Sequence, residues 1–301
     1  MERGPRAIKY IINGDDFGAS PNVNKGFLEA ADNGLLHSAS VLATGAAFEQ
    51  AMHAARERPS LQVRLHLNLV EGFALSERHA IPDLVDARGV FSCSFGKLLA
   101  ISVGPSKLRD RYRAQIKTEL SAQIERFWQA LGEHGQTNGL MVDSHVHFHM
   151  IPVVFEALME IHEHTPLAYV RNPYERLFLK EGKLSPRHHL GVNLIKNCLL
   201  RILAKRVKSE LVARDIAFFD RIVGVLFTDA MNQAVVASAV AQLNNEDGTH
   251  SAEILMHPGR ASEDEAELWP QKVFRDYYRS PQRDIERETL LNPQFKALFV
   301  D

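Results

Sequence analysis

Residues 7–16 read AIKYIINGDD, an apolar segment that leads directly into a glycine and two adjacent aspartates. The apolar part, residues 7–12, predicts a buried strand, and residues 13–16 predict a polar turn after it. Residues 23–33 follow with a helical pattern, and Gly34 is a common terminator of such a helix. A buried strand followed by a turn and a helix is the repeating unit of an α/β fold.

The same unit recurs along the rest of the chain. Further strands are expected at 39–43, 63–69, 140–145, 169–170, 222–227 and 252–256, and further helices at 46–58, 106–131, 153–164 and 233–243. Strands that alternate with helices predict a parallel sheet. We expect one domain over residues 1–301, with a long loop at 70–105 and a basic helical insertion at 176–214.

The expected strands end in polar residues that could carry chemistry. Asp15 and Asp16 follow the first strand, and His66, His145 and His257 lie at or near the ends of three others. Catalytic groups of a β/α barrel gather at the carboxyl ends of its strands. Four contributing strand ends favour an α/β fold of the distorted, incomplete (β/α) TIM-like barrel type. A doubly wound open sheet, which also binds ligands at carboxyl strand ends, is the alternative.

The amino-acid composition argues against several classes of protein. The 301 residues are 45% hydrophobic with a formal net charge of -2, which argues against a general nucleic-acid binder. Cys93 and Cys198 are the only cysteines, which argues against a disulfide framework and fits a reducing compartment. No apolar run approaches the roughly 20 residues of a membrane span, and the start lacks a signal-peptide core. We expect a cytoplasmic protein.

The adjacent carboxylates of Asp15 and Asp16 predict a metal site. Two such groups at a strand end repel each other unless a positive charge neutralises them. A divalent cation would do so, with one aspartate as ligand and its neighbour free for proton transfer. The alternative is an ordinary polar turn, in which Gly-Asp pairs are common.

Residues 143–149, DSHVHFH, are the most informative stretch. If this segment is extended, Asp143, His145, His147 and His149 share one face. Three imidazoles on one face are difficult to explain by packing, and neutral imidazole is the commonest metal ligand.

Two further histidines, each alone in its segment, are candidates for the same site. His66 lies on the polar side of the alternating segment 63–69, where a histidine is as readily structural as functional. His257 precedes Pro258 and Gly259, a turn that would expose it at its strand end as a candidate general acid. Gly-x-Ser-x-Gly, P-loop and Gly-x-Gly-x-x-Gly motifs are absent, so other hydrolase and nucleotide-binding classes lack support.

Four motifs in order resemble the YdjC-like carbohydrate deacetylases, which include chitooligosaccharide deacetylases and a hopanoid-associated branch. They are NGDDFG at 13–18, LHLN at 65–68, DSHVHFH at 143–149 and HPG at 257–259. The segments LVEG at 69–72 and IPDLVD at 81–86 most resemble the hopanoid-associated branch. The resemblance covers residues 8–259; the insertion and the tail after residue 259 have no counterpart in the chitooligosaccharide branch.

The resemblance implies an incomplete barrel that hydrolyses the N-acetyl group of an amino sugar, on an N-acetylglucosamine-containing oligosaccharide or glycolipid, and releases acetate. It assigns Asp16, His66 and His145 to the metal, Asp15 to the general base, His257 to the general acid, and His147 and Arg171 to the second shell or the sugar. Ligand softness would suit zinc, iron or manganese, whereas the resemblance implies magnesium first and zinc second. We also consider a homodimer.

Two rival functions stand beside this one. Amidohydrolases and phosphoesterases also use His-x-His pairs, but typically on an early strand, where this chain has Asp15 and Asp16. A non-catalytic metal- or sugar-binding barrel is the other rival. Binding alone would need neither the base Asp15 nor the acid His257.

The insertion at 176–214 holds ten lysines and arginines against Glu181 and Glu210. Apolar residues recur in it at helical spacing: Leu194, Ile195, Leu199, Ile202, Leu203, Val207 and Leu211. An amphipathic helix with a basic face is expected. It either packs on the barrel with a solvated charged side or makes peripheral contact with an anionic membrane surface.

Overall fold

Seven parallel strands form one curled sheet in the computed structural model, which describes residues 8–135 and 139–299. The strands are β1 (Lys9–Phe17), β2 (Ser38–Leu42), β3 (Gln62–Leu67), β4 (Leu140–Ser144), β5 (Leu167–Val170), β6 (Arg221–Val223) and β7 (Ser251–Met256). Their order across the sheet is β5-β4-β3-β2-β1-β7-β6. The last two strands therefore lie beside the first, as they do in a barrel.

The sheet is a barrel that stays open between β5 and β6. Every neighbouring pair is parallel, and within the described residues no ladder joins β5 to β6. A doubly wound sheet would instead reverse its strand order around β1. The expectation of a distorted, incomplete TIM-like barrel is confirmed.

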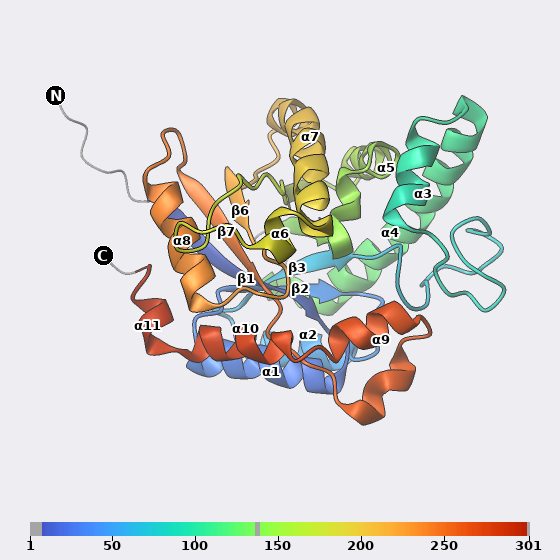
Figure 1. The fold of residues 1–301 in the computed structure, drawn as a ribbon. Coiled ribbons are helices and arrows are strands. Elements are labelled where there is room, and N and C mark those ends of the chain that lie inside the picture. The colour runs from blue at the N-terminus through green and yellow to red at the C-terminus, as the bar shows by residue number, and fades with distance from the viewer. Residues whose placement is uncertain (1–7, 136–138, 300–301) are drawn as a thin grey trace.

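Helices surround the curled sheet (Figure 1). They are α1 (Pro21–Asn33), α2 (Phe48–Arg56), α3 (Phe95–Ser102), α4 (Ser106–Gly135), α5 (Pro152–His162), α6 (Pro186–His189), α7 (Val192–Ala213), α8 (Gln233–Asn244), α9 (Lys272–Tyr278), α10 (Gln282–Leu291), α11 (Pro293–Lys296) and the 3-10 helices η2 (His145–Met150) and η3 (Glu263–Leu268). In the described ranges, none has the length and apolarity needed to cross a bilayer.

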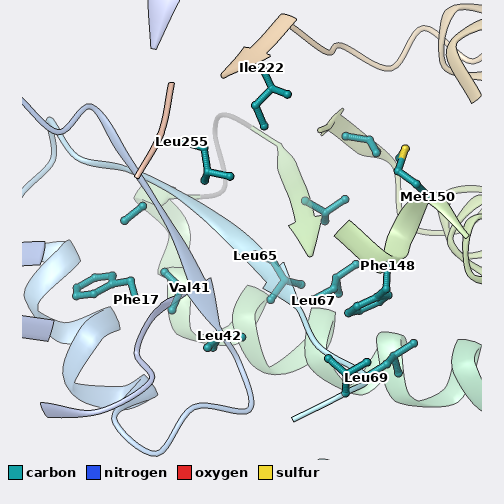
Figure 2. Close-up of a cluster of buried hydrophobic side chains, with 14 of the residues drawn as sticks. Phe17, Val41, Leu42, Leu65, Leu67, Leu69, Phe148, Met150, Ile222 and Leu255 are labelled. Carbon is teal, nitrogen blue, oxygen red and sulfur yellow. The ribbon is translucent and has the colours of Figure 1, made fainter. Parts of the chain in front are cut away.

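The apolar core continues from strand to strand. Phe17, Val41 and Leu65 are partners in register on β1, β2 and β3, and all three are fully buried. Figure 2 shows these side chains together with Leu67 and with Phe148 from η2. Strands of a parallel sheet are covered on both faces, which explains their near-continuous apolar sequences.

β1 extends further than expected. The polar residues 13–16 belong to the strand, which runs on to Phe17, so the predicted turn at this position is wrong. The register with β2 shifts between Asp15 and Phe17, and Asp16 has a φ of 80°. Such a bulge redirects a side chain, and bulges are frequent next to active sites.

The segment after β4 is not extended, so the predicted common face of residues 143–149 is wrong. The chain enters η2 at His145, and Val146 and His147 adopt left-handed φ values of 49° and 58°. His149 turns back, and its Nε2 lies 2.8 Å from the carbonyl oxygen of Arg171. His149 therefore has a structural contact, while His145 stays at the strand end.

Other elements also differ from the sequence analysis. The strand expected at 222–227 ends at Val223. Residues 95–102, which were placed in the long loop, form α3. The insertion contains α6 and α7 and lies in the chain between β5 and β6, where the barrel is open.

Candidate metal centre

The carboxyl ends of four strands surround one pocket. Asp15 and Asp16 of β1, His66 of β3, His145 after β4 and His257 after β7 all line it. Because the strands are parallel, their carboxyl ends meet at one edge of the sheet, and side chains far apart in sequence come together there.

Asp16, His66 and His145 form a compact group. Asp16 Oδ1 lies 3.1 Å from His145 Nδ1 and 3.5 Å from His66 Nε2, and one ligand atom from each residue lies within 4.8 Å of the other two. Ligands that bind one zinc-sized ion at about 2.0–2.2 Å stand on the order of 3 Å apart. The spacing and the donor types therefore fit a divalent cation.

Arg283 and Tyr277 hold the other oxygen of Asp16. The Arg283 guanidinium donates to Asp16 Oδ2, and the Tyr277 hydroxyl lies 3.3 Å from the same atom. Burial would raise the pKa of Asp16, but the charge of Arg283 and the two histidines outweigh it and hold the pKa well below its usual value. Asp16 is thus an ionised carboxylate whose Oδ1 faces the histidines.

Asp143 orients the ring of His66. His66 Nδ1 lies 2.6 Å from Asp143 Oδ1, which leaves Nε2 on the side of Asp16. Burial lowers the pKa of His66, but the charges of Asp15 and Asp143 raise it to about 10. Histidines that bind metals usually have such a carboxylate partner, because it fixes the tautomer and the ring orientation.

Glu71 is a functional candidate that the sequence analysis missed. Its Oε2 lies 3.1 Å from His145 Nε2, and its Oε1 accepts a hydrogen bond of 2.9 Å from the Tyr278 hydroxyl. Although burial opposes it, the charge of Glu71 helps to raise the pKa of His145 to about 9. His145 is therefore oriented by carboxylates on both nitrogens.

Arg171 fixes the carboxylate of Asp15. Its Nη1 and Nη2 donate to Asp15 Oδ2 and Oδ1 at 2.7 Å and 2.8 Å, and Asn13 donates to Oδ1 at 2.8 Å. Arg171 is fully buried, also pairs with Asp143 and Glu253, and is not among the residues that line the pocket. Of its two expected roles, the geometry supports orienting a carboxylate.

Substitution of Arg171 by methionine is expected to lower the free energy of unfolding by roughly 3–5 kcal/mol, because three buried carboxylates then lose a shared cation. Urea denaturation followed by circular dichroism measures this. Arg58→Met, which removes an exposed pair with Asp32, is the matched control and should cost about 0–1 kcal/mol. Equal losses of unfolding free energy in the two variants would show that Arg171 does not stabilise the buried carboxylates.

His257 is buried and not exposed at its strand end, so that expectation is wrong. The turn at Pro258 and Gly259 packs so closely on α1 that a Cβ at Gly259 would lie 2.3 Å from the carbonyl oxygen of Val23. The His257 backbone N–H donates to Glu286 Oε2 at 2.6 Å, and Nδ1 lies 3.3 Å from that oxygen. The ring still lines the pocket.

His147 also lines the pocket. Its buried Nδ1 has no hydrogen-bond partner among the described residues. Burial, with the charges of Lys196 and Arg171, holds the pKa of His147 well below its usual value. A neutral imidazole with an unused nitrogen therefore faces the pocket, beside the three metal candidates.

Comparison with known proteins places the chain in a family. The family model described as YdjC-like protein matches residues 9–301. The chain belongs to the YdjC-like family. The match includes the insertion and the tail, for which the sequence analysis had found no counterpart in one branch of the family.

Several relatives of this YdjC-like chain are named carbohydrate deacetylase. The mouse protein (Mus musculus) is 33% identical over 170 residues, 56% of this chain and 52% of its own length. The Brevibacillus brevis protein is 34% identical over 206 residues, 65% of this chain and 75% of its own. The Geobacillus stearothermophilus protein is 36% identical over 153 residues, 51% of this chain and 55% of its own. The chain thus spans about half the length of several relatives that it matches.

A solved structure shares the fold. It is an Enterococcus faecalis V583 protein described in connection with cellobiose-phosphate cleavage, with a TM-score of 0.65 and 21% sequence identity. The match covers 97% of this chain and 94% of the other. At that identity the likeness concerns the fold alone.

The tail of this YdjC-like chain supplies residues that sequence reasoning did not find. Tyr277 of α9 and Arg283 of α10 reach Asp16, and Glu286 of α10 reaches His257. No pattern within the tail indicates these contacts, because each joins residues far apart in sequence. Glu71 had a weak signal, since it lies in the LVEG segment of the resemblance.

Proposed function

We propose that this chain is a metal-dependent hydrolase that removes an N-acetyl group from an amino sugar and releases acetate. The substrate class is an N-acetylglucosamine-containing oligosaccharide or glycolipid. The observation that carries the proposal is the convergence of Asp16, His66 and His145 in one pocket with Asp15 and His257. Relatives named carbohydrate deacetylase support the same reaction.

The three candidate ligands would hold a divalent cation. When bound, such an ion lowers the pKa of water and polarises a carbonyl oxygen, which together activate an amide for hydrolysis. The family resemblance favours magnesium first and zinc second, whereas a donor set of two imidazoles and one carboxylate is softer than magnesium prefers. Metal analysis of the purified protein decides between them.

Asp15 is proposed as the general base. The water oxygen bonds to the acetyl carbon while its proton moves to Asp15. Arg171 and Asn13 hold both carboxylate oxygens in place, so the base is oriented before the substrate arrives. Such positioning of a proton acceptor is what general base catalysis requires.

His257 is proposed as the general acid. The carbon–nitrogen bond breaks as the imidazolium gives a proton to the departing amine, and the products are acetate and a free amino sugar. Glu286 beside Nδ1 orients the ring. His257 lines the same pocket as Asp15, so the two proton-transfer groups can serve one bound amide.

The wall of the pocket suits the body of a sugar. Phe274, Tyr277 and Val273 line it beside the polar groups, and small-molecule sites commonly combine apolar and aromatic walls with a few polar groups. The Phe274 ring lies 5.5 Å from the His145 ring, centroid to centroid. A ring bound on this wall would lie next to the proposed ligands.

A product screen tests the proposal against its rivals. The metal-loaded protein is incubated with N-acetylated chitooligosaccharides, simple N-acyl amides and phosphate esters, and acetate, free amine and phosphate are measured. We expect equal amounts of acetate and free amine from the N-acetylated sugars. Phosphate release would indicate a phosphoesterase, turnover of simple amides alone an amidohydrolase, and metal binding without any product a binding protein.

A further inference from the structure

α7 carries an apolar stripe that is mostly exposed. Val192, Ile195, Leu199 and Ile202 recur at spacings of three and four residues, which places them on one side of the helix. Val192, Ile195 and Ile202 are 79%, 70% and 67% exposed, and Leu199 is half-buried with one side packed against the core. We call these four residues the α7 stripe. The sequence analysis had put Ile195, Leu199 and Ile202 on one apolar face together with Leu203, Val207 and Leu211, whereas the structure exposes Ile195 and Ile202 and buries the last three.

A different side of α7 packs against the protein. Leu200, Leu203, Ala204, Val207 and Leu211 are buried, and they also recur at spacings of three and four residues. These side chains anchor α7 on the barrel together with Leu199. The three exposed residues of the stripe, Val192, Ile195 and Ile202, are therefore not needed to hold the helix in place.

A row of positive charge runs along the same helix. Arg201, Lys205 and Lys208 are spaced by four and three residues, and Arg206 follows Ile202 by one helical turn. Arg201 and Lys205 lie 5.8 Å from the centroid of the Tyr174 ring, and Lys208 lies 5.7 Å from that of Phe218. Among the described residues, no carboxylate lies within 4.0 Å of any of the four. We call Arg201, Lys205, Arg206 and Lys208 the α7 basic row.

The stripe begins at the mouth of the catalytic pocket. Lys196, the neighbour of Ile195, lines the pocket together with Asp15. Val146 and Val273 also line it and are 36% and 66% exposed, so part of the pocket rim is apolar. In Figure 1, α7 stands in gold at the top of the molecule.

We propose that the α7 stripe and the α7 basic row dock this protein on an anionic lipid surface. Apolar side chains of an interfacial helix enter the boundary between headgroups and acyl chains, while basic residues attract anionic lipids. Because no carboxylate neutralises the basic row, an anionic surface is its complementary partner. A second copy packed on the stripe would bring the Arg206 side chains of both copies to the interface, and like charges disfavour such an interface.

Docking would bring the pocket to a sugar that is carried on a lipid. This part rests on the proposed deacetylase function, whereas the docking itself does not. Because the stripe starts beside Lys196, the pocket mouth would lie close to the lipid surface. A lipid-linked N-acetyl sugar could then be reached without leaving the membrane.

Vesicle co-sedimentation of the full chain tests the docking. Phosphatidylcholine vesicles are compared with vesicles that also contain phosphatidylglycerol, at low and high salt. We expect binding that requires the anionic lipid and weakens as salt rises. Ile195→Ser with Ile202→Ser should weaken it roughly tenfold for each side chain, and Lys205→Gln with Lys208→Gln roughly fivefold for each charge. Val103→Ser, at an exposed valine outside α7, is the matched control and should bind as the unaltered chain does.

Each outcome decides between docking, assembly and catalysis. No vesicle binding at low salt, or equal binding by the stripe variant and the control, would overturn the docking. If the unaltered chain forms a dimer in solution and the stripe variant does not, the stripe binds a second copy of the chain and not a membrane. Acetate release from soluble chitooligosaccharides should be unchanged in the stripe variant. Vesicle binding without any deacetylation would refute the proposed function and leave the docking intact.

Discussion

Replacement of His66 by alanine is expected to abolish metal retention and acetate release while the fold stays intact. His66 Nε2 is one of three donor atoms around the proposed ion, and its ring lies between Asp16 and Asp143. Loss of an outer-shell partner typically costs roughly 10–100-fold in affinity or activity, so loss of a direct ligand should cost more. Metal content after dialysis and the rate of acetate release measure the two effects.

His53→Ala is the control for this variant, because His53 is an exposed histidine of α2. It should keep both metal and activity. Circular dichroism checks that both variants remain folded. A His66→Ala protein that retains its full metal content would remove His66 from the metal site.

Replacement of Asp15 by asparagine is expected to keep the metal and lose most of the turnover. Asparagine preserves the shape of the side chain but cannot accept the proton of the attacking water. General acid–base groups typically contribute 10²–10⁴-fold to the rate, so kcat should fall by about that factor. Acetate release at saturating substrate measures it, with the metal content determined on the same sample.

The matched comparison for Asp15→Asn is Asp16→Asn on the neighbouring residue. That change removes the charge of the proposed ligand, so the metal should be lost together with the activity. If Asp15→Asn loses the metal and Asp16→Asn keeps it, the roles of the two carboxylates have been assigned the wrong way round.

The polar residues at the strand ends could be predicted from the sequence. Asp15, Asp16 and His145 follow or end apolar segments, and a parallel sheet brings such ends together whatever the loops between them do. His145 lies at the end of its strand as expected, although the segment after it is not extended. The left-handed residues Val146 and His147 turn the chain just after it, and no periodicity in this stretch signals that turn.

The residues that surround the site could not be predicted from the sequence. Arg283 and Glu71 reach Asp16 and His145 through contacts between distant segments, which no local pattern encodes. The α7 stripe shows the same limit. Helical spacing predicted an apolar face, but it could not tell which of two apolar sides packs on the barrel, because that depends on where the helix docks.

A metal titration of acetate release shows whether hydrolysis depends on an ion bound at Asp16, His66 and His145. The protein is stripped with a chelator, reloaded stepwise with Mg²⁺ or Zn²⁺, and assayed on an N-acetylated chitooligosaccharide. We expect negligible acetate release from the stripped protein and a rate that rises until one ion is bound per chain, then levels off. Full acetate release by the stripped protein would contradict this expectation.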